Sequence, residues 1–135
     1  MSPVNPKKEK EDLDFGIQFY EGILKDSPNF IETLMALGDL YTKKGLYQKG
    51  LEIDLRLTKL RPDNAVVFYN LACSHALLRN IPSALRAIRT AIDLGYEDIE
   101  YIDQDPDLEN LRQDQQFLEY LDEIRKKQKP SKAKS

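Results

Sequence analysis

The sequence predicts an all-α fold in which helical hairpins are stacked into an array. Apolar residues recur at spacings of three and four along most of the chain, which is the period of an amphipathic helix. Glycine, proline or asparagine interrupts this pattern every 14 to 18 residues, a distance that suits helices better than strands. Similar residues also return after a shift of 34 positions. These observations favour an α-solenoid of about seven or eight helices, including short ones, with a C-terminal capping helix.

Composition narrows the class of protein. The chain has 135 residues, of which 41% are hydrophobic and 32% charged, so it is long enough for one small domain and too apolar for a disordered chain. Cys73 is the single cysteine and His75 the single histidine, which excludes an intramolecular disulfide and any metal site that needs two imidazoles. No stretch approaches the roughly 20 apolar residues of a membrane span, and the start does not resemble a secretory signal. We therefore expect a cytoplasmic protein without membrane contact.

Charge is distributed unevenly along the chain. The net charge is −3, but residues 125–135 hold six basic side chains and no acidic one. Residues 95–124 hold eleven acidic side chains and a single basic one, Arg112. An acidic body of this kind lacks the clustered lysines and arginines that phosphate contacts need, so we do not expect it to bind nucleic acid.

The expected helices follow one another from about residue 12. Proline cannot continue a helix, and glycine or asparagine tolerates the left-handed residue that often follows a helix end. The first five helices are therefore predicted to end near Pro28, Gly45, Pro62, Asn80 and Gly95.

The closing part of the chain begins differently. Asp105 followed by Pro106 is a favourable helix start, and Asp114 can cap a last helix. The apolar side of that helix is expected to hold Phe117, Leu118, Leu121 and Ile124. The predicted organisation is a single domain over 12–124, made of a half-repeat (12–30), two repeats (31–64 and 65–98) and a closing segment (99–124), between disordered tails at 1–11 and 125–135.

The internal repeat has a recognisable pattern. A shift of 34 aligns Gly38 with Ala72, and small residues return in this way where two helices must cross closely. The segment from Ala36 to Tyr41, and the equivalent segment from Tyr69 to Ala76, resemble the tetratricopeptide (TPR) repeat family over about residues 12–124. Asp54 departs from that pattern, because the family usually has an aromatic residue there. The resemblance implies a TPR array.

No catalytic constellation emerges from the sequence. Cys73 and His75 lie two residues apart on a helix, so their side chains diverge by about 200° and cannot act as a nucleophile and its base. The acidic run from Asp103 to Asp114 resembles a calcium loop, but Leu108 stands where the sharp turn requires glycine. Asp105 and Asp114 are better explained as helix caps. The chain is expected not to be an enzyme and to need no cofactor and no metal.

The TPR resemblance places a partner-binding groove on the first helix of each hairpin. Tyr69 is the expected anchor, because an exposed aromatic ring often dominates a binding surface. Only Asn70 matches the lysine and asparagine clamp with which some family members bind a C-terminal carboxylate, so a ligand of that kind is not expected. The groove residues implied by the resemblance are Glu32, Met35, Asp39 and Lys43 of one helix, and Val66, Tyr69, Asn70, Cys73 and Leu77 of the other.

The resulting prediction is a non-catalytic protein–protein interaction module, or adaptor, that holds a peptide segment or helix of a partner in this concave groove. One alternative is a self-assembling structural subunit that forms a homo-oligomer through the groove or the cap. A further alternative is an adaptor that contacts RNA or the ribosome through the basic tail.

Overall fold

The computed structural model describes residues 5–133, and the side chains of residues 5–128. Within that range the chain forms α-helices and short 3₁₀ helices and contains no strand, as the sequence predicts. None of these helices is long and apolar enough to cross a membrane. The elements are α1 (Pro6–Asp26), α2 (Ile31–Lys44), α3 (Tyr47–Leu60), α4 (Ala65–Leu77), α5 (Ile81–Asp93), α6 (Ile99–Ile102), η1 (Pro106–Leu108), η2 (Leu111–Gln113) and α7 (Gln115–Ala133).

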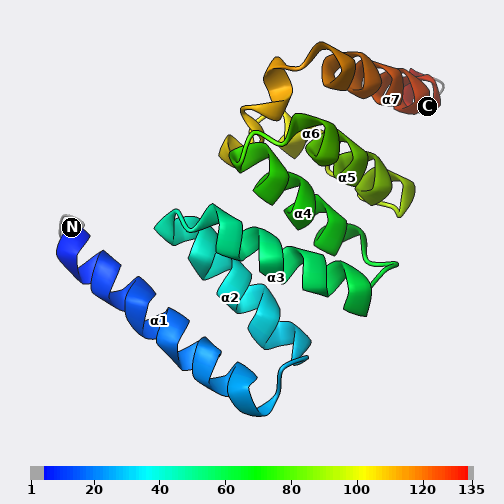
Figure 1. The fold of residues 1–135 in the computed structure, drawn as a ribbon. Coiled ribbons are helices and arrows are strands. Elements are labelled where there is room, and N and C mark those ends of the chain that lie inside the picture. Colours follow the sequence, from blue (N-terminus) through cyan, green and yellow to red (C-terminus); the bar gives the residue numbers. More distant parts are fainter. Residues whose placement is uncertain (1–4, 134–135) are drawn as a thin grey trace.

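The helices stack in chain order into an open array (Figure 1). Helices α2 and α3 form one hairpin, and α4 and α5 form the next, while α1 packs on α2 and α3 packs on α4. The short elements α6, η1 and η2 lead the chain back over the second hairpin to α7, which covers the end of the array. Neighbouring helices therefore bury apolar faces against one another, as expected for a solenoid.

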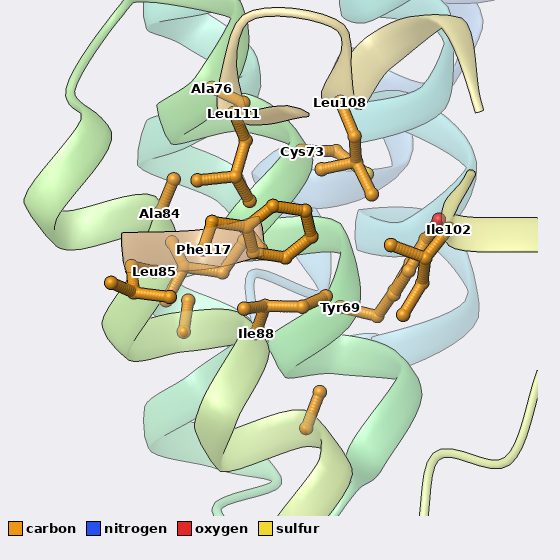
Figure 2. Close-up of a cluster of buried hydrophobic side chains, with 14 of the residues drawn as sticks. Tyr69, Cys73, Ala76, Ala84, Leu85, Ile88, Ile102, Leu108, Leu111 and Phe117 are labelled. Carbon is orange, nitrogen blue, oxygen red and sulfur yellow. The ribbon is translucent and has the colours of Figure 1, made fainter. Parts of the chain in front are cut away.

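The core consists of two clusters of buried side chains. The first joins α1, α2 and α3 and includes Val67 of α4. The second joins the hairpin of α4 and α5 to the closing elements and includes Leu51 of α3. Figure 2 shows the second cluster, in which the fully buried ring of Phe117 lies amid Ala84 and Ile88 of α5 and Leu111 of η2. The first cluster comprises Ile17, Leu34, Leu37, Tyr41, Ile53, Leu57 and Val67.

Small residues allow the two helices of each hairpin to approach closely. A Cβ atom added to Gly38 on α2 would come within 3.2 Å of the Cγ2 atom of Ile53 on α3. Ala72, which occupies the equivalent place in α4, is completely buried.

Replacing Ala72 with leucine should therefore overpack the second hairpin and lower the free energy of unfolding by about 1–3 kcal/mol. Urea unfolding followed by far-ultraviolet circular dichroism measures the change. Ala65, at the start of α4 and partly exposed, provides the control, because a leucine there has more room. A variant at Ala72 as stable as the wild type would contradict the close crossing.

Most helix ends agree with the sequence prediction. Gly45 and Gly95 have φ angles of 84° and 110°, which is the left-handed region that glycine enters without strain. The end of α4 differs from the expectation. The left-handed residue there is Arg79, with φ of 61°, and Asn80 instead precedes the first residue of α5. The chain turns one residue earlier than the asparagine preference predicts.

The predicted tails require a correction. Residues 6–11 are helical, because the Asn5 side chain accepts hydrogen bonds from the first turn and Pro6 stands where a helix tolerates proline. At the other end, α7 continues through residue 133, and Arg125 and Lys126 form ion pairs with Asp103 and Asp122. Disorder is therefore the wrong prediction for 6–11 and 125–133. Its remaining parts, residues 1–4 and 134–135, lie outside the described residues.

Candidate functional site: an acidic groove

A hollow lies between the first helices of the two hairpins. It has a volume of about 240 Å³ and is bounded by α2 and α4, with α3 at its floor and α6 and η1 at one end. We call it the acidic groove. Its lining consists of Met35, Gly38, Asp39, Thr42, Asp54, Leu57, Tyr69, Asn70, Cys73, Ser74, Tyr101, Asp105 and Asp107.

The structure brings only part of the predicted groove together. Five of the nine expected residues line the hollow, namely Met35, Asp39, Tyr69, Asn70 and Cys73. The other four do not line it, namely Glu32, Lys43, Val66 and Leu77. The closing segment contributes three residues that sequence reasoning does not place in the groove, namely Tyr101, Asp105 and Asp107.

Tyr69 is not the exposed anchor that the sequence suggests. Its side chain is 7% exposed, and its hydroxyl donates a hydrogen bond of 2.6 Å to Asp105. Its ring stacks on Tyr96 with the two centroids 4.3 Å apart. Burial, and the hydrogen bond to a carboxylate, raise the pKa of the phenol well above its usual value. Tyr69 therefore positions the wall of the groove, and its ring is largely inaccessible to a partner.

Asp105 fixes the end of the groove. One carboxylate oxygen accepts the Tyr69 hydroxyl, and the other accepts the backbone N–H of Asp107, which confirms the predicted cap. The guanidinium of Arg112 donates to the backbone carbonyl oxygens of Asp105 and Ile102. Asp114 also acts as the predicted cap, accepting the backbone N–H of Phe117. The Tyr69 bond joins the closing segment to α4, and the other bonds fix the shape of the segment itself.

Asp54 is a carboxylate in the interior of the protein. It lies on α3, is 7% exposed, and accepts a hydrogen bond of 2.5 Å from the hydroxyl of Ser74. No residue among those described donates a hydrogen bond to its other oxygen, Oδ1. Burial raises the pKa of this carboxyl from 3.8 to about 6. The sequence signal is the acid itself, standing where the repeat pattern expects an aromatic residue.

Two further carboxylates face the mouth of the groove. Asp39 on α2 is exposed and pairs with Lys43 of the same helix at 3.0 Å. Asp107 on η1 is half-buried, and burial raises its pKa, with the nearby carboxylates of Asp105 and Asp39 adding to the rise. No lysine, arginine or histidine is among the lining residues. The lining is therefore acidic, and the nearest basic group in these contacts is Lys43, which pairs with Asp39.

Three potential metal-binding side chains lie together in the groove. The Cys73 thiol and the carboxylates of Asp105 and Asp107 have oxygen and sulfur atoms within 4.8 Å of one another. Burial raises the pKa of the thiol, however, and metal ions bind the thiolate. The His75 ring instead lies beside Asn80, at 3.4 Å, and does not line the groove. Cys73 and His75 thus point apart, as their spacing on the helix predicts.

Sequence comparison finds a relative that matches part of the chain. No family model matches the chain. The chain is 38% identical over 80 residues to a curated protein of Arabidopsis thaliana whose name describes it as chloroplastic. The matched residues are 57% of this chain and 24% of that protein. The chain thus spans about a quarter of the length of this curated relative.

Solved structures of MamA resemble most of the array. The structure of MamA from Desulfovibrio magneticus RS-1, from residue 41 to its end, has a TM-score of 0.66 and 18% identity. That match covers 90% of this chain and 71% of the MamA chain. A crystal structure of MamA has a TM-score of 0.61 and 26% identity, covering 82% and 69% of the two chains. The repeat pattern, the stacked hairpins and these neighbours agree on the fold: the chain folds as a helical-hairpin array of the tetratricopeptide-repeat type.

Proposed function

We propose that the chain is a non-catalytic interaction module that binds a cationic segment of a partner protein in the acidic groove. The observation that carries this proposal is the lining of the hollow, which contains four carboxylates and no basic side chain. The fold supports it, since the TPR fold suggests a protein-interaction or scaffold module.

The depth at which each carboxylate lies suggests how a partner would be recognised. Asp39 and Asp107 lie where an arriving lysine or arginine side chain meets them first. Asp54 lies deeper, and among the described residues its Oδ1 oxygen accepts no hydrogen bond. Burial disfavours the charged form of this carboxyl. A partner cation close to Asp54 would favour the charged form of the carboxyl. Binding would therefore offset the desolvation cost that this buried charge has in the free protein.

The experiment compares two end-blocked peptides of twelve residues, one with four arginines and one with glutamine in their place. We expect the arginine peptide to bind more tightly and its affinity to fall as salt rises, since exposed charge pairs are screened. The double variant Asp39→Asn, Asp107→Asn should weaken binding by roughly tenfold, at somewhat less than 1 kcal/mol for each charge lost. Isothermal titration calorimetry measures both affinities.

The matched control is Glu32→Gln, which removes an exposed acid from α2 outside the acidic groove. It should leave the affinity almost unchanged, because it removes one negative charge from the protein and none from the groove. Equal binding of the two peptides would argue against a cationic ligand. Equal losses in the double variant and in the control would move the binding surface away from the groove.

A further inference from the structure

Helix α1 presents an unpartnered aromatic stripe to solvent. The side chains of Phe15 and Phe19 are 73% and 56% exposed, and they lie one turn apart on the same side of the helix. The opposite side of α1 packs on α2, where Ile17 is buried in the first core cluster. Gly22 lies one turn beyond Phe19, and nothing approaches within 4 Å of the place where its Cβ would be. The stripe is therefore both apolar and unobstructed.

The internal repeat indicates what kind of element covers such a stripe. A shift of 34 residues brings Phe19 onto Ile53 of α3 and then onto Ala87 of α5. Both of these residues are buried, and Ile53 contacts the first helix of its own hairpin near Gly38. In two places, then, this chain covers the equivalent face with an antiparallel helix. Among the described residues, α1 has no such helix beside Phe19.

Phe15 distinguishes α1 from the other two helices. The residues equivalent to it are Lys49 in α3 and Ser83 in α5, which are polar. The aromatic stripe is thus a feature of α1 alone and not a copy of a packing position that every repeat needs.

Two opposite charges lie at equal distances from the two ends of the stripe, and one of them, Lys8, also lies 4.0 Å from Asp12 of the same helix. Lys8 lies seven residues before Phe15, and Asp26 lies seven residues after Phe19, so all four share one side of α1. Two copies of α1 can pack antiparallel about a two-fold axis that crosses the helix at the level of Ile17. Phe15 of one copy then lies opposite Phe19 of the other. The same register places Lys8 opposite Asp26, twice in each pair. The stripe is therefore self-complementary in its rings and in these two charges, as a two-fold interface requires.

We propose that this face of α1 binds a second copy of the chain, forming a closed two-fold dimer through antiparallel α1 helices. One helix from each chain makes a small interface, so the dimer is expected to be weak and to depend on concentration. This assembly uses the face of α1 opposite α2 and leaves the acidic groove free, so it is independent of the function proposed above.

Sedimentation velocity from about 5 µM to 1 mM tests the proposal, because a small interface gives weak association in this range. The wild type should shift from monomer to dimer and no further. The double variant Phe15→Ser, Phe19→Ser should raise the dissociation constant at least tenfold while keeping its helicity, since both rings are exposed. The matched control is Phe30→Ser, which removes an exposed ring outside α1.

Charge reversal tests the register. Lys8→Glu alone sets two acids against each other across the interface, and Asp26→Lys alone sets two lysines against each other. Each should raise the dissociation constant by roughly threefold, in keeping with exposed ion pairs. A mixture of the two variants restores both opposite-charge contacts and should associate more tightly than either alone.

Several outcomes would overturn the dimer. These are a monomer at every concentration, a dimer indifferent to the loss of Phe15 and Phe19, or a mass that rises beyond two copies. A mixture of charge variants that associates no better than its components would exclude the antiparallel register.

Discussion

Replacing Asp54 with asparagine should stabilise the protein by up to about 3 kcal/mol at neutral pH, and much less near pH 4. The pKa of this carboxyl is about 6 in the folded protein, against 3.8 as its ordinary value. One pKa unit corresponds to about 1.4 kcal/mol, so the two units between these values give the expected gain. Asparagine has nearly the same shape and can still accept the hydrogen bond of Ser74 through its amide oxygen.

The pH dependence has a definite sign. A carboxyl whose pKa is higher in the folded state binds its proton more tightly there, so the folded state holds more protons between pH 3.8 and about 6. Stability of the wild type therefore falls as the pH rises through this window, and the full penalty is present above it. The asparagine variant has no group at this position that titrates, so its advantage should appear between these pH values.

Urea unfolding of both proteins at one-unit intervals from pH 4 to pH 8 measures the difference directly. Asp63→Asn, in the exposed loop between α3 and α4, is the control and should change stability little at any pH. An equal gain at pH 4 and pH 7 would show that the carboxylate charge is not the cause. The variant Asp54→Asn should also bind the arginine peptide more weakly, because a buried charge that destabilises the free protein can contribute to binding.

Local chemistry explains why so much of the fold could be predicted from the sequence. Gly45 and Gly95 stop helices through their own backbone freedom, and Asp105 and Asp114 cap helices through contacts two or three residues away. These effects need no knowledge of the rest of the chain. The close crossing at Gly38 was also predictable, because the repeat carries a small residue to the same place in the next hairpin.

The groove was less predictable because long-range contacts build it. Tyr69 occupies the inner side of α4, as the repeat pattern implies, but Asp105 lies 36 residues further on and draws its hydroxyl into a buried hydrogen bond. Helical periodicity gives the direction in which Tyr69 points, and not what will cover it. The short turns that place Asp105 and Asp107 in the groove contain too few residues to show a hydrophobic period in the sequence.

The tails show a different reason for error. A polar, charged segment has little to bury, and composition alone therefore favours disorder for residues 6–11. The cap at Asn5, together with the apolar residues that follow in α1, extends that helix to its first turn. Composition indicates how much apolar surface a segment can bury. It does not show that the segment can extend a helix formed by the residues that follow it.

Replacing Phe117 with alanine should have the largest effect on stability, a loss of about 3–5 kcal/mol, because the whole ring is buried and a cavity would remain. Leu118, the next residue in α7, provides a matched control. The sequence predicts it on the apolar side of α7, but its side chain is 43% exposed. Leu118→Ala should therefore cost at most a few tenths of a kcal/mol, although both changes shorten a large apolar side chain in the same turn.

The position of Phe117 links this loss to the acidic groove. Its ring belongs to the same buried cluster as Ile102 and Leu108, which flank the turn that carries Asp105 and Asp107 (Figure 2). Urea unfolding should show one transition at lower concentration, since the cluster also includes residues of α4 and α5. Unfolding in two steps, with the hairpins as stable as before, would contradict this coupling. The arginine peptide should bind Phe117→Ala more weakly than Leu118→Ala even where both are folded, because the cavity loosens the support of the two carboxylates at the end of the groove.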